Sequence, residues 1–333
     1  MILITGATGL VGGHLLYRFR ESGNSIIALY RDLKTLDKTR EIFESYEKGA
    51  SALVENFQWL QADILEIPSL EKAMKNVTTV YHCAAAIDGS NFEHLKNINM
   101  RGTENVINVA IASGVNKLCH VSSIAALGES VGGRAVNEDD YFNLDGLNTD
   151  YAITKFGAEM EAWRATQENL EIIIVNPGVV LGEGNWDSGS GQLFSKTASG
   201  NSFYTSGSSG FVDVRDVAKA MQELTESNYT NERLILVSEN KSYKDVMDYI
   251  AISLNKKKPS IKLSKTLLTA VSYLLKIPNL LGLKRKLSTA TVSSLTSNTK
   301  YSNENAKEVL SFDFISLPET IERVCEFYKE RKR

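Results

Sequence analysis

Cysteine and histidine are scarce in this sequence. The 333 residues include three cysteines and four histidines. The cysteines, Cys83, Cys119 and Cys325, stand far apart and form no Cys-x-x-Cys spacing. This pattern excludes the common zinc-binding motifs, and a few scattered thiols are typical of proteins in a reducing compartment. We therefore expect a cytoplasmic protein with no bound metal.

An excess of charge of either sign is also missing. The chain has 37 basic and 40 acidic residues, which gives a formal net charge of -3. Proteins that bind nucleic acid usually carry a strongly positive domain, so this balance argues against such a partner. The hydrophobic content of 43% is ordinary for a soluble globular protein.

Long hydrophobic runs are absent as well. Met1 is followed directly by the apolar segment ILIT, so we expect no targeting segment. One apolar stretch covers residues 267–283, but Lys276 and Pro278 interrupt it and it is short for a membrane span. We expect a buried or amphipathic helix there and no membrane span. Contact with a membrane surface remains the alternative.

The sequence does contain a regular alternation of apolar β-type runs and helical segments. The expected strands cover residues 2–5, 26–30, 57–63, 77–85, 117–123 and 171–178. This alternation predicts an α/β fold, a Rossmann-type doubly wound parallel sheet. Ligands of such sheets bind outside the carboxyl ends of the strands.

The second half of the chain changes in character. Residues 182–210 are rich in glycine and serine, which is typical of a long loop. A strand at 233–238 follows, and the remainder is largely helical. We expect residues 1–178 with 211–238 to form the dinucleotide-binding domain. Residues 179–210 with 239–315 form a smaller, mostly helical substrate lobe, and 316–333 a C-terminal helix.

Three glycines, Gly6, Gly9 and Gly12, directly follow the first strand. One permits a tight turn, another lets backbone amides approach a pyrophosphate, and the third lets helix and strand pack closely. The positive end of the helix then faces the phosphates. We expect the cofactor to contact Gly6, Thr8, Gly9, Leu10, Val11 and Gly12.

The end of the second strand bears on the choice of cofactor. NAD sites place an acidic residue there, whereas NADP sites place an arginine near the 2′-phosphate. Here Tyr30 occupies the usual acidic position, Arg31 follows, and Asp32 lies two residues beyond that position. The pattern favours NADP(H) over NAD(H). After the third strand, Asp63 and its neighbour Ile64 are expected beside the adenine, and a helix cap is the alternative role for Asp63.

Tyr151 and Lys155 are spaced to share one face of a helix. A nearby ammonium lowers the pKa of a tyrosine, which allows proton exchange near neutral pH. The serines of HVSS, residues 120–123, end an expected strand, where a hydroxyl can bind a substrate oxygen beside a nicotinamide.

These motifs, with several others in the same order, resemble the extended short-chain dehydrogenase/reductase superfamily. That superfamily includes NAD-dependent epimerase/dehydratases, dihydroflavonol-4-reductase-like enzymes and 3β-hydroxysteroid-dehydrogenase-like enzymes. The resemblance rests on the glycine turn, VYHCAA (80–85), NINMRGTENVI (97–107), HVSSIAALG (120–128), Tyr151/Lys155, VNPGVVLG (175–182) and FVDVRDVA (211–218).

The resemblance implies that Tyr151, Lys155 and Ser123 are catalytic, with Ser123 chosen because it precedes Gly128 by five positions. It also implies a homodimer formed through helices near 97–113 and 151–168. Further residues implied near the cofactor are His82, Ala84 and Ala85 along the ribose and pyrophosphate, Pro177, Gly178 and Ser122 near the nicotinamide, and Asn99 as a support of the backbone. Asp213 and Asp216 are expected to hold the returning chain.

The family resemblance leaves three kinds of function open. The dehydratase branch carries an acidic pair where this chain has Ile124 and Ala125, and many epimerases have a tyrosine at the position of Leu127. The residues 284–286 offer cations for a sugar diphosphate, although a solvated basic surface explains them equally. We expect an NADP(H)-dependent carbonyl reductase or alcohol dehydrogenase. A nucleoside-diphosphate-sugar epimerase and a non-catalytic NADP sensor are the alternatives.

Aromatic and apolar residues support a small apolar substrate. Those of the expected loop and lobe are Trp186, Phe194, Phe203, Tyr204, Leu267, Leu268, Leu274, Leu275 and Leu280. They suit an apolar carbonyl or alcohol better than a diphosphate.

Overall fold

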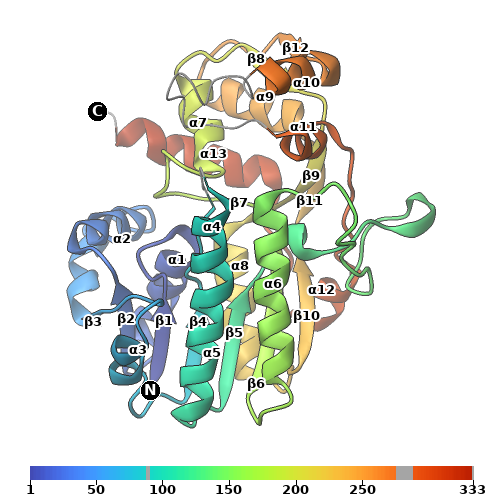
Figure 1. Cartoon of the computed structure of the whole chain (residues 1–333). Coiled ribbons are helices and arrows are strands. Elements are labelled where there is room, and N and C mark those ends of the chain that lie inside the picture. Colours follow the sequence, from blue (N-terminus) through green and yellow to red (C-terminus); the bar gives the residue numbers. More distant parts are fainter. Residues whose placement is uncertain (88–90, 275–287, 332–333) are drawn as a thin grey trace.

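The larger domain is built on a seven-stranded sheet in which every neighbouring pair is parallel (Figure 1). The computed structural model describes residues 1–87, 91–274 and 288–331. The strands, in their order across the sheet, are β10 (Glu232–Leu236), β6 (Glu171–Pro177), β5 (Lys117–Val121), β4 (Thr79–His82), β1 (Ile2–Thr5), β2 (Ile26–Tyr30) and β3 (Gln58–Gln61). The order reverses at β1 and β4, where a doubly wound sheet binds its ligands. The Rossmann-type prediction is confirmed.

Alternate residues of the strands enter two separate cores, one on each face of the sheet. Ile4 packs with Leu15 and Val217 on one face, and its neighbour Leu3 packs with Val106 on the other. This alternation follows from the two-residue period of a strand. The helices involved are α1 (Leu10–Arg18), α2 (Leu36–Glu44) and α8 (Val214–Glu226) on the first face, and α3 (Ile67–Ala73), α5 (Gly102–Ala112) and α6 (Asp150–Ala165) on the second. 

Short helices complete this domain. They are α4 (Phe92–Leu95), the π-helix η4 (Lys96–Arg101), α12 (Glu304–Val309) and the 3₁₀ turns η1 (Phe19–Glu21), η2 (Leu33–Thr35), η3 (Ala50–Asn56), η5 (Ile124–Ala126) and η6 (Val131–Gly133).

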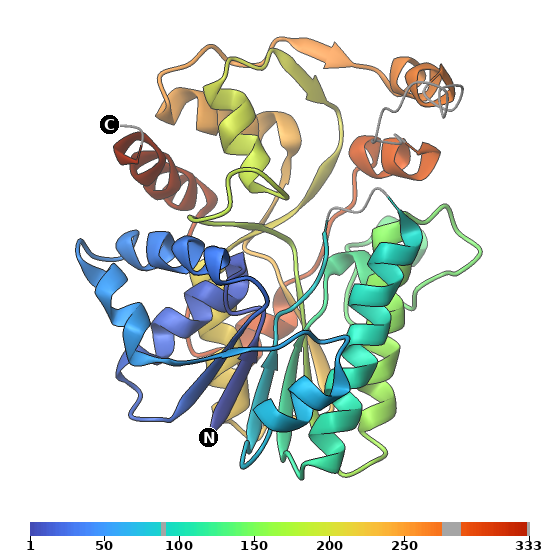
Figure 2. The same ribbon diagram turned by 60° about the vertical axis from the view of Figure 1, so that its left-hand side comes forward.

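The smaller lobe sits over the carboxyl ends of the strands (Figure 2). Phe194, Phe211, Val246 and Ile321 belong to its own apolar core. The elements of the lobe are strands β7 (Val179–Leu181), β8 (Phe203–Thr205), β9 (Ser208–Asp213), β11 (Glu239–Ser242) and β12 (Ile261–Leu263), and helices α7 (Gly191–Ala198), α9 (Tyr243–Ser253), α10 (Lys265–Leu274), α11 (Thr289–Thr296) and α13 (Leu317–Glu330). None of the helices in the described part of the chain is long and apolar enough to cross a membrane.

Two segments differ from the sequence-based expectation. Residues 182–210 are not one long loop, because they include α7, β8 and the start of β9. The segment 301–315 packs on the larger domain, since Ala306 and Leu310 are buried in the core of the sheet. In both segments, apolar side chains are buried against parts of the fold that local composition does not reveal. The expected C-terminal helix is present as α13, which packs in the core of the lobe. Of the apolar stretch 267–283, residues 275–283 lie outside the described residues.

Candidate active site

A cavity of about 650 Å³ lies between the carboxyl edge of the sheet and the lobe. The larger domain contributes the glycine turn, the residues that follow β5 and β6, and one face of α6. Eleven of the residues expected at the site line this cavity, namely Gly9, Leu10, Val11, Gly12, Ala85, Ser122, Ser123, Tyr151, Lys155, Pro177 and Gly178.

The glycine turn has the geometry that a dinucleotide requires. Gly6 adopts a φ of 65°, and a side chain there would meet the backbone of Ala84 at 2.6 Å. A side chain on Gly12 would meet the carbonyl oxygen of Gly6 at 2.3 Å, so α1 can approach the turn this closely only because residue 12 is glycine. Gly9 is the N-cap of α1 and provides no side-chain cap, so amides of the first turn remain available to a pyrophosphate. The turn therefore fits the cofactor. Thr8 lies within it, half-buried.

At the end of β2, Arg31 is exposed, and its carbonyl accepts a hydrogen bond from Gln61. The carboxylate of Asp32 accepts a hydrogen bond from the amide of Lys34 at 3.0 Å and caps a 3₁₀ turn. The carboxylate of Asp32 therefore holds its own turn. Arg31 is the charged residue nearest in sequence to Tyr30, which occupies the usual acidic position.

Beyond β3, Asp63 accepts a hydrogen bond from the amide of Leu65 at 2.9 Å. The bond closes a local turn and is not the helix cap that the sequence left open as the alternative, because the N-cap of α3 is Glu66. Ile64 is buried and packs against Gly102. Neither side chain reaches the cavity described above.

His82 differs most from its expected role beside the cofactor. Its side chain is buried, and its two ring nitrogens lie 2.7 Å from the hydroxyl of Thr5 and 2.9 Å from that of Thr103. Burial lowers the pKa of His82 to about 3, so the ring is neutral at physiological pH. The imidazole of His82 links β4 to β1 and α5. Both of its ring nitrogens are hydrogen-bonded within the protein, so neither is free to bind a ligand.

Asn99 supports the backbone next to the cavity, as the resemblance implied. It lies in the π-helix and is fully buried. Its carbonyl oxygen accepts from the amide of Ala86 at 2.7 Å, and its amide donates to the carbonyl of Ala86 and to Thr154. The same residue therefore ties the segment after β4, which contains Ala84, to helix α6.

Ser123, Tyr151 and Lys155 come together at the cavity wall. Burial raises the pKa of Tyr151, and the neighbouring hydroxyl of Ser123 opposes the rise. The Ser123 hydroxyl also accepts a hydrogen bond from the amide of Ala125 at 3.1 Å. The sequence-based expectation of a lowered pKa is wrong. Its physical reason is that desolvation of the phenol dominates, while the ammonium of Lys155 donates to the carbonyl of Val121 at 2.7 Å.

Lys155 is almost fully buried, and burial lowers its pKa to about 8. The negative charge of Glu159 opposes this effect and favours the ammonium. Glu159 lies one helical turn further along α6 than Lys155, so the two side chains share a face.

Glu159 is a buried carboxylate that the sequence analysis missed. Ser122 donates to it at 2.5 Å, Asn176 at 2.8 Å and Arg233 at 2.9 Å. Asn176 also donates to the carbonyl of Ser123. The network connects the end of β5, β6, β10 and α6 directly behind Ser123 and Lys155. A signal was present in the sequence, because an acid recurs at the helical spacing of Tyr151 and Lys155.

Asp213 and Asp216 hold the chain, as expected, and do not reach the cavity. Asp213 caps α8 and accepts hydrogen bonds from Thr320 and Arg323 of α13. Asp216 accepts from the amide of Ile315 at 2.7 Å. Asp213 thus ties α13 to the start of α8, and Asp216 anchors the returning segment to the larger domain.

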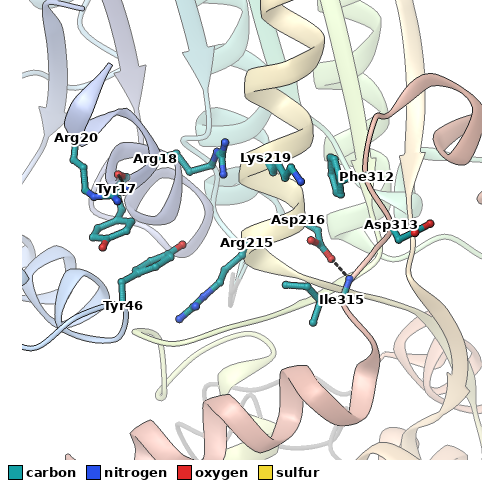
Figure 3. Close-up of a pocket in the computed structure, with 10 residues that line it drawn as sticks. All are labelled: Tyr17, Arg18, Arg20, Tyr46, Arg215, Asp216, Lys219, Phe312, Asp313 and Ile315. Atoms are coloured by element: carbon teal, nitrogen blue, oxygen red, sulfur yellow. Dashed lines mark hydrogen bonds between the residues drawn. The ribbon is translucent and has the colours of Figure 1, made fainter. Parts of the chain in front are cut away.

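A second cavity of about 440 Å³ lies beside α1 and α8 (Figure 3). Two of its basic side chains make cation–π contacts. Arg215 lies 4.0 Å from the ring centre of Tyr46, and Lys219 lies 4.0 Å from the ring centre of Phe312. None of the expected cofactor or catalytic residues lines it. We interpret it as part of the junction between the returning chain and the larger domain.

The lobe provides a wall of different composition. Tyr243 of α9 and, from α11, Ala290 and Ser293 line the cavity on this side. Phe142 and Tyr301 also line the cavity but pack on the larger domain, Phe142 against Phe156 of α6. Trp186 and Phe194, which the sequence suggested for the substrate, instead pack in the core of the lobe. Phe203 is exposed on β8. Residues 284–286, Leu275 and Leu280 lie outside the described residues. No cluster of three or more potential metal ligands occurs within residues 1–87, 91–274 and 288–331.

Comparison with known proteins agrees with this geometry. The family model described as "NAD dependent epimerase/dehydratase family" matches residues 2–235. A putative dihydroflavonol 4-reductase of Synechocystis sp. is 26% identical over 258 residues, covering 74% of this chain and 71% of that protein. The crystal structure of gox2253 has a TM-score of 0.84 and 25% sequence identity, covering 100% of this chain and 99% of that one.

A second solved structure, MoeE5 in complex with UDP-glucose and NAD, has a TM-score of 0.75 at 20% identity, covering 100% of this chain and 99% of that one. At that identity the likeness concerns the fold. The family match extends over the glycine turn, the Tyr151/Lys155 pair and every strand of the larger sheet. The chain therefore belongs to the NAD-dependent epimerase/dehydratase family of extended short-chain dehydrogenases/reductases, enzymes that bind a nicotinamide dinucleotide.

Proposed function

We propose that this protein is an NADP(H)-dependent oxidoreductase that reduces the carbonyl of a small apolar substrate, or oxidises the corresponding alcohol. The observation that carries the proposal is that Ser123, Tyr151 and Lys155 line one cavity, which the glycine turn also lines. A bound nicotinamide would supply or accept the hydride.

The chain's own groups supply the proton and the orientation. The hydroxyl of Ser123 orients and polarises the substrate oxygen, and Tyr151 donates its proton to that oxygen as the carbonyl is reduced. Burial keeps the pKa of Tyr151 high, so the phenol is protonated at neutral pH, which suits the reductive direction. Lys155 supplies a buried positive charge near the phenolate that forms and, by family resemblance, binds the ribose hydroxyls.

Two features support the cofactor and substrate assignments. Arg31 is exposed at the end of β2 while Asp32 caps a turn, which favours a 2′-phosphate. The lobe wall at α11 consists of small side chains, Ala290, Ser293 and Ser294, which carry no charge to bind a diphosphate. We also propose a homodimer through the α5 and α6 region, and a cytoplasmic location that agrees with three free cysteines.

Nucleotide-sugar epimerisation is the second candidate, and the solved structure with UDP-glucose and NAD supports it at the level of the fold. One experiment separates the two. The purified protein is incubated with NADPH or NADH and a panel of aldehydes and ketones, and cofactor consumption is followed. Stoichiometric consumption that is lost in Tyr151→Phe supports the oxidoreductase. A cofactor that copurifies and is never consumed, while a UDP- or GDP-sugar is isomerised, contradicts it.

A further inference from the structure

The charges of this protein are divided unequally along the chain. Residues 249–303 contain ten of the 37 basic residues and none of the 40 acidic ones. The rest of the chain is therefore strongly acidic. Within the described part of this stretch, Lys256, Lys257, Lys258, Lys262 and Lys265 are all exposed. 

These lysines lie at the outer end of the lobe. They follow α9 and surround β12 and the start of α10, which both views place at the end of the lobe away from the larger domain (Figures 1 and 2). The nearest preceding acid in the sequence, Asp248, is paired with Lys244 at 2.6 Å. The five lysines thus have no acidic neighbour in sequence that neutralises them.

Large apolar side chains are exposed among the lysines. Phe203 of β8 and Ile261 of β12 are register partners, and their exposed fractions are 48% and 49%. On α10, Leu267 and Val271 are one turn apart and remain 50% and 36% exposed, while Leu268 is buried. One face of α10 therefore turns outward with apolar residues at helical spacing. The opposite side packs on α11, whose Ala290 and Ser293 line the active-site cavity.

We propose that this face of the lobe, formed by β8, β12, α10 and the lysines 256–265, docks on the surface of an anionic lipid membrane. Interleaved lysines and apolar side chains match the two layers of such a surface. Apolar groups enter the boundary between headgroups and acyl chains, and ammonium groups remain among the anionic headgroups. An acidic protein surface would pair with the lysines but would not bury the exposed side chains of Leu267 and Phe203. This inference goes beyond the proposed reaction and does not depend on it.

Co-sedimentation of the full-length protein with lipid vesicles tests the proposal. We expect binding to an equal mixture of phosphatidylcholine and phosphatidylglycerol, and much weaker binding to phosphatidylcholine alone. High salt should release the protein, because the attraction acts within a Debye length. Equal binding to both vesicles, or no binding, would overturn the proposal. So would capture by immobilised polyglutamate without any binding to vesicles.

Variants assign the binding to this face. Replacing Lys256, Lys257 and Lys258 by alanine should lower the partition coefficient about 100-fold, at about fivefold per lysine. Leu267→Ser with Val271→Ser should lower it at least about tenfold. The matched control replaces three exposed lysines of the larger domain, Lys72, Lys75 and Lys307, and should bind like the wild type. Thermal unfolding of each variant shows whether the fold is kept. Equal losses in the control and the lobe variant would refute the assignment.

Discussion

The two walls of the active-site cavity are made in different ways. On the larger domain, Ser123 accepts a hydrogen bond from the amide of Ala125 and Lys155 donates one to the carbonyl of Val121. Glu159 lies behind them and accepts from three donors within 2.9 Å. The lobe side presents small hydroxyl and apolar groups on helices, of which Ala290 is an example.

This difference separates two tasks. A buried polar network loses much when one member is removed, because the remaining groups are left unsatisfied in a medium of low polarity. Such a network fixes reacting groups and tolerates little change. An apolar wall makes many weak contacts and can change shape at modest cost. From this comparison we expect the larger domain to determine the reaction and the lobe to determine the substrate.

The largest expected effect is on the proton donor. Tyr151→Phe should lower kcat about 10²- to 10⁴-fold, because it removes general acid catalysis. The lobe tyrosine of the same cavity provides the matched control, and Tyr243→Phe should change kcat only a few-fold. Steady-state rates with NADPH and a water-soluble aldehyde measure both. Similar losses in the two variants would break the comparison between the walls.

The next largest effect concerns stability. Glu159→Gln should lower the free energy of unfolding by about 3 kcal/mol, because Arg233 loses its buried counter-charge. Glu168→Gln removes an acid of a surface pair with Arg164 and should cost less than about 1 kcal/mol. Chemical denaturation measures both values. If Glu159→Gln costs no more than the surface variant, the network does not hold the catalytic wall together.

Cofactor choice should respond to Arg31. Arg31→Ala should weaken NADPH binding roughly 10- to 100-fold, which is the loss of one charge-assisted hydrogen bond, and should leave NADH nearly unchanged. Dissociation constants from fluorescence titration provide the measurement. An equal loss for both cofactors would exclude a role at the 2′-phosphate. Lys75→Ala, an exposed position on the larger domain, serves as the control.

The pH profile should report the buried ammonium. Because the pKa of Lys155 lies at about 8, kcat/KM should fall as pH rises through that value and the positive charge is lost. Glu159 raises this pKa, so in Glu159→Gln the same limb should move to lower pH. The profile of kcat/KM measures the shift. A limb that stays in place in the variant would show that Glu159 does not act on Lys155.

The smallest effect is expected on the lobe wall. Ala290→Leu should raise KM a few-fold for bulky substrates and leave kcat for small aldehydes unchanged, because it only reduces the room beside α11. Ala112→Leu, at an exposed position on α5, should change neither constant. Comparison of KM across substrates of increasing size checks this. A large fall in kcat would mean that the lobe also positions the reacting groups.

Local patterns were sufficient wherever a residue's role depends on its own segment. The run ILIT, the glycines after it and the four-residue spacing of Tyr151 and Lys155 are properties of single strands, turns and helices. The sequence therefore predicted the sheet and the positions of these groups on its elements. The same reasoning failed for Trp186 and Phe194, because an aromatic residue in a glycine-rich segment suits a binding wall and a buried core equally.

By itself, the sequence determined the Rossmann-type sheet and the dinucleotide turn, because short-range periodicity and motif spacing specify them. The three catalytic candidates came from the resemblance of its motifs to a known family. Only the tertiary structure showed that His82 is occupied inside the fold and that Tyr151 has a raised pKa. The structure likewise showed that Glu159 gathers Ser122, Asn176 and Arg233 from three other strands and loops. The reason is physical: burial and hydrogen-bond partners depend on segments that are distant in the chain, and those are the quantities that set pKa and orientation.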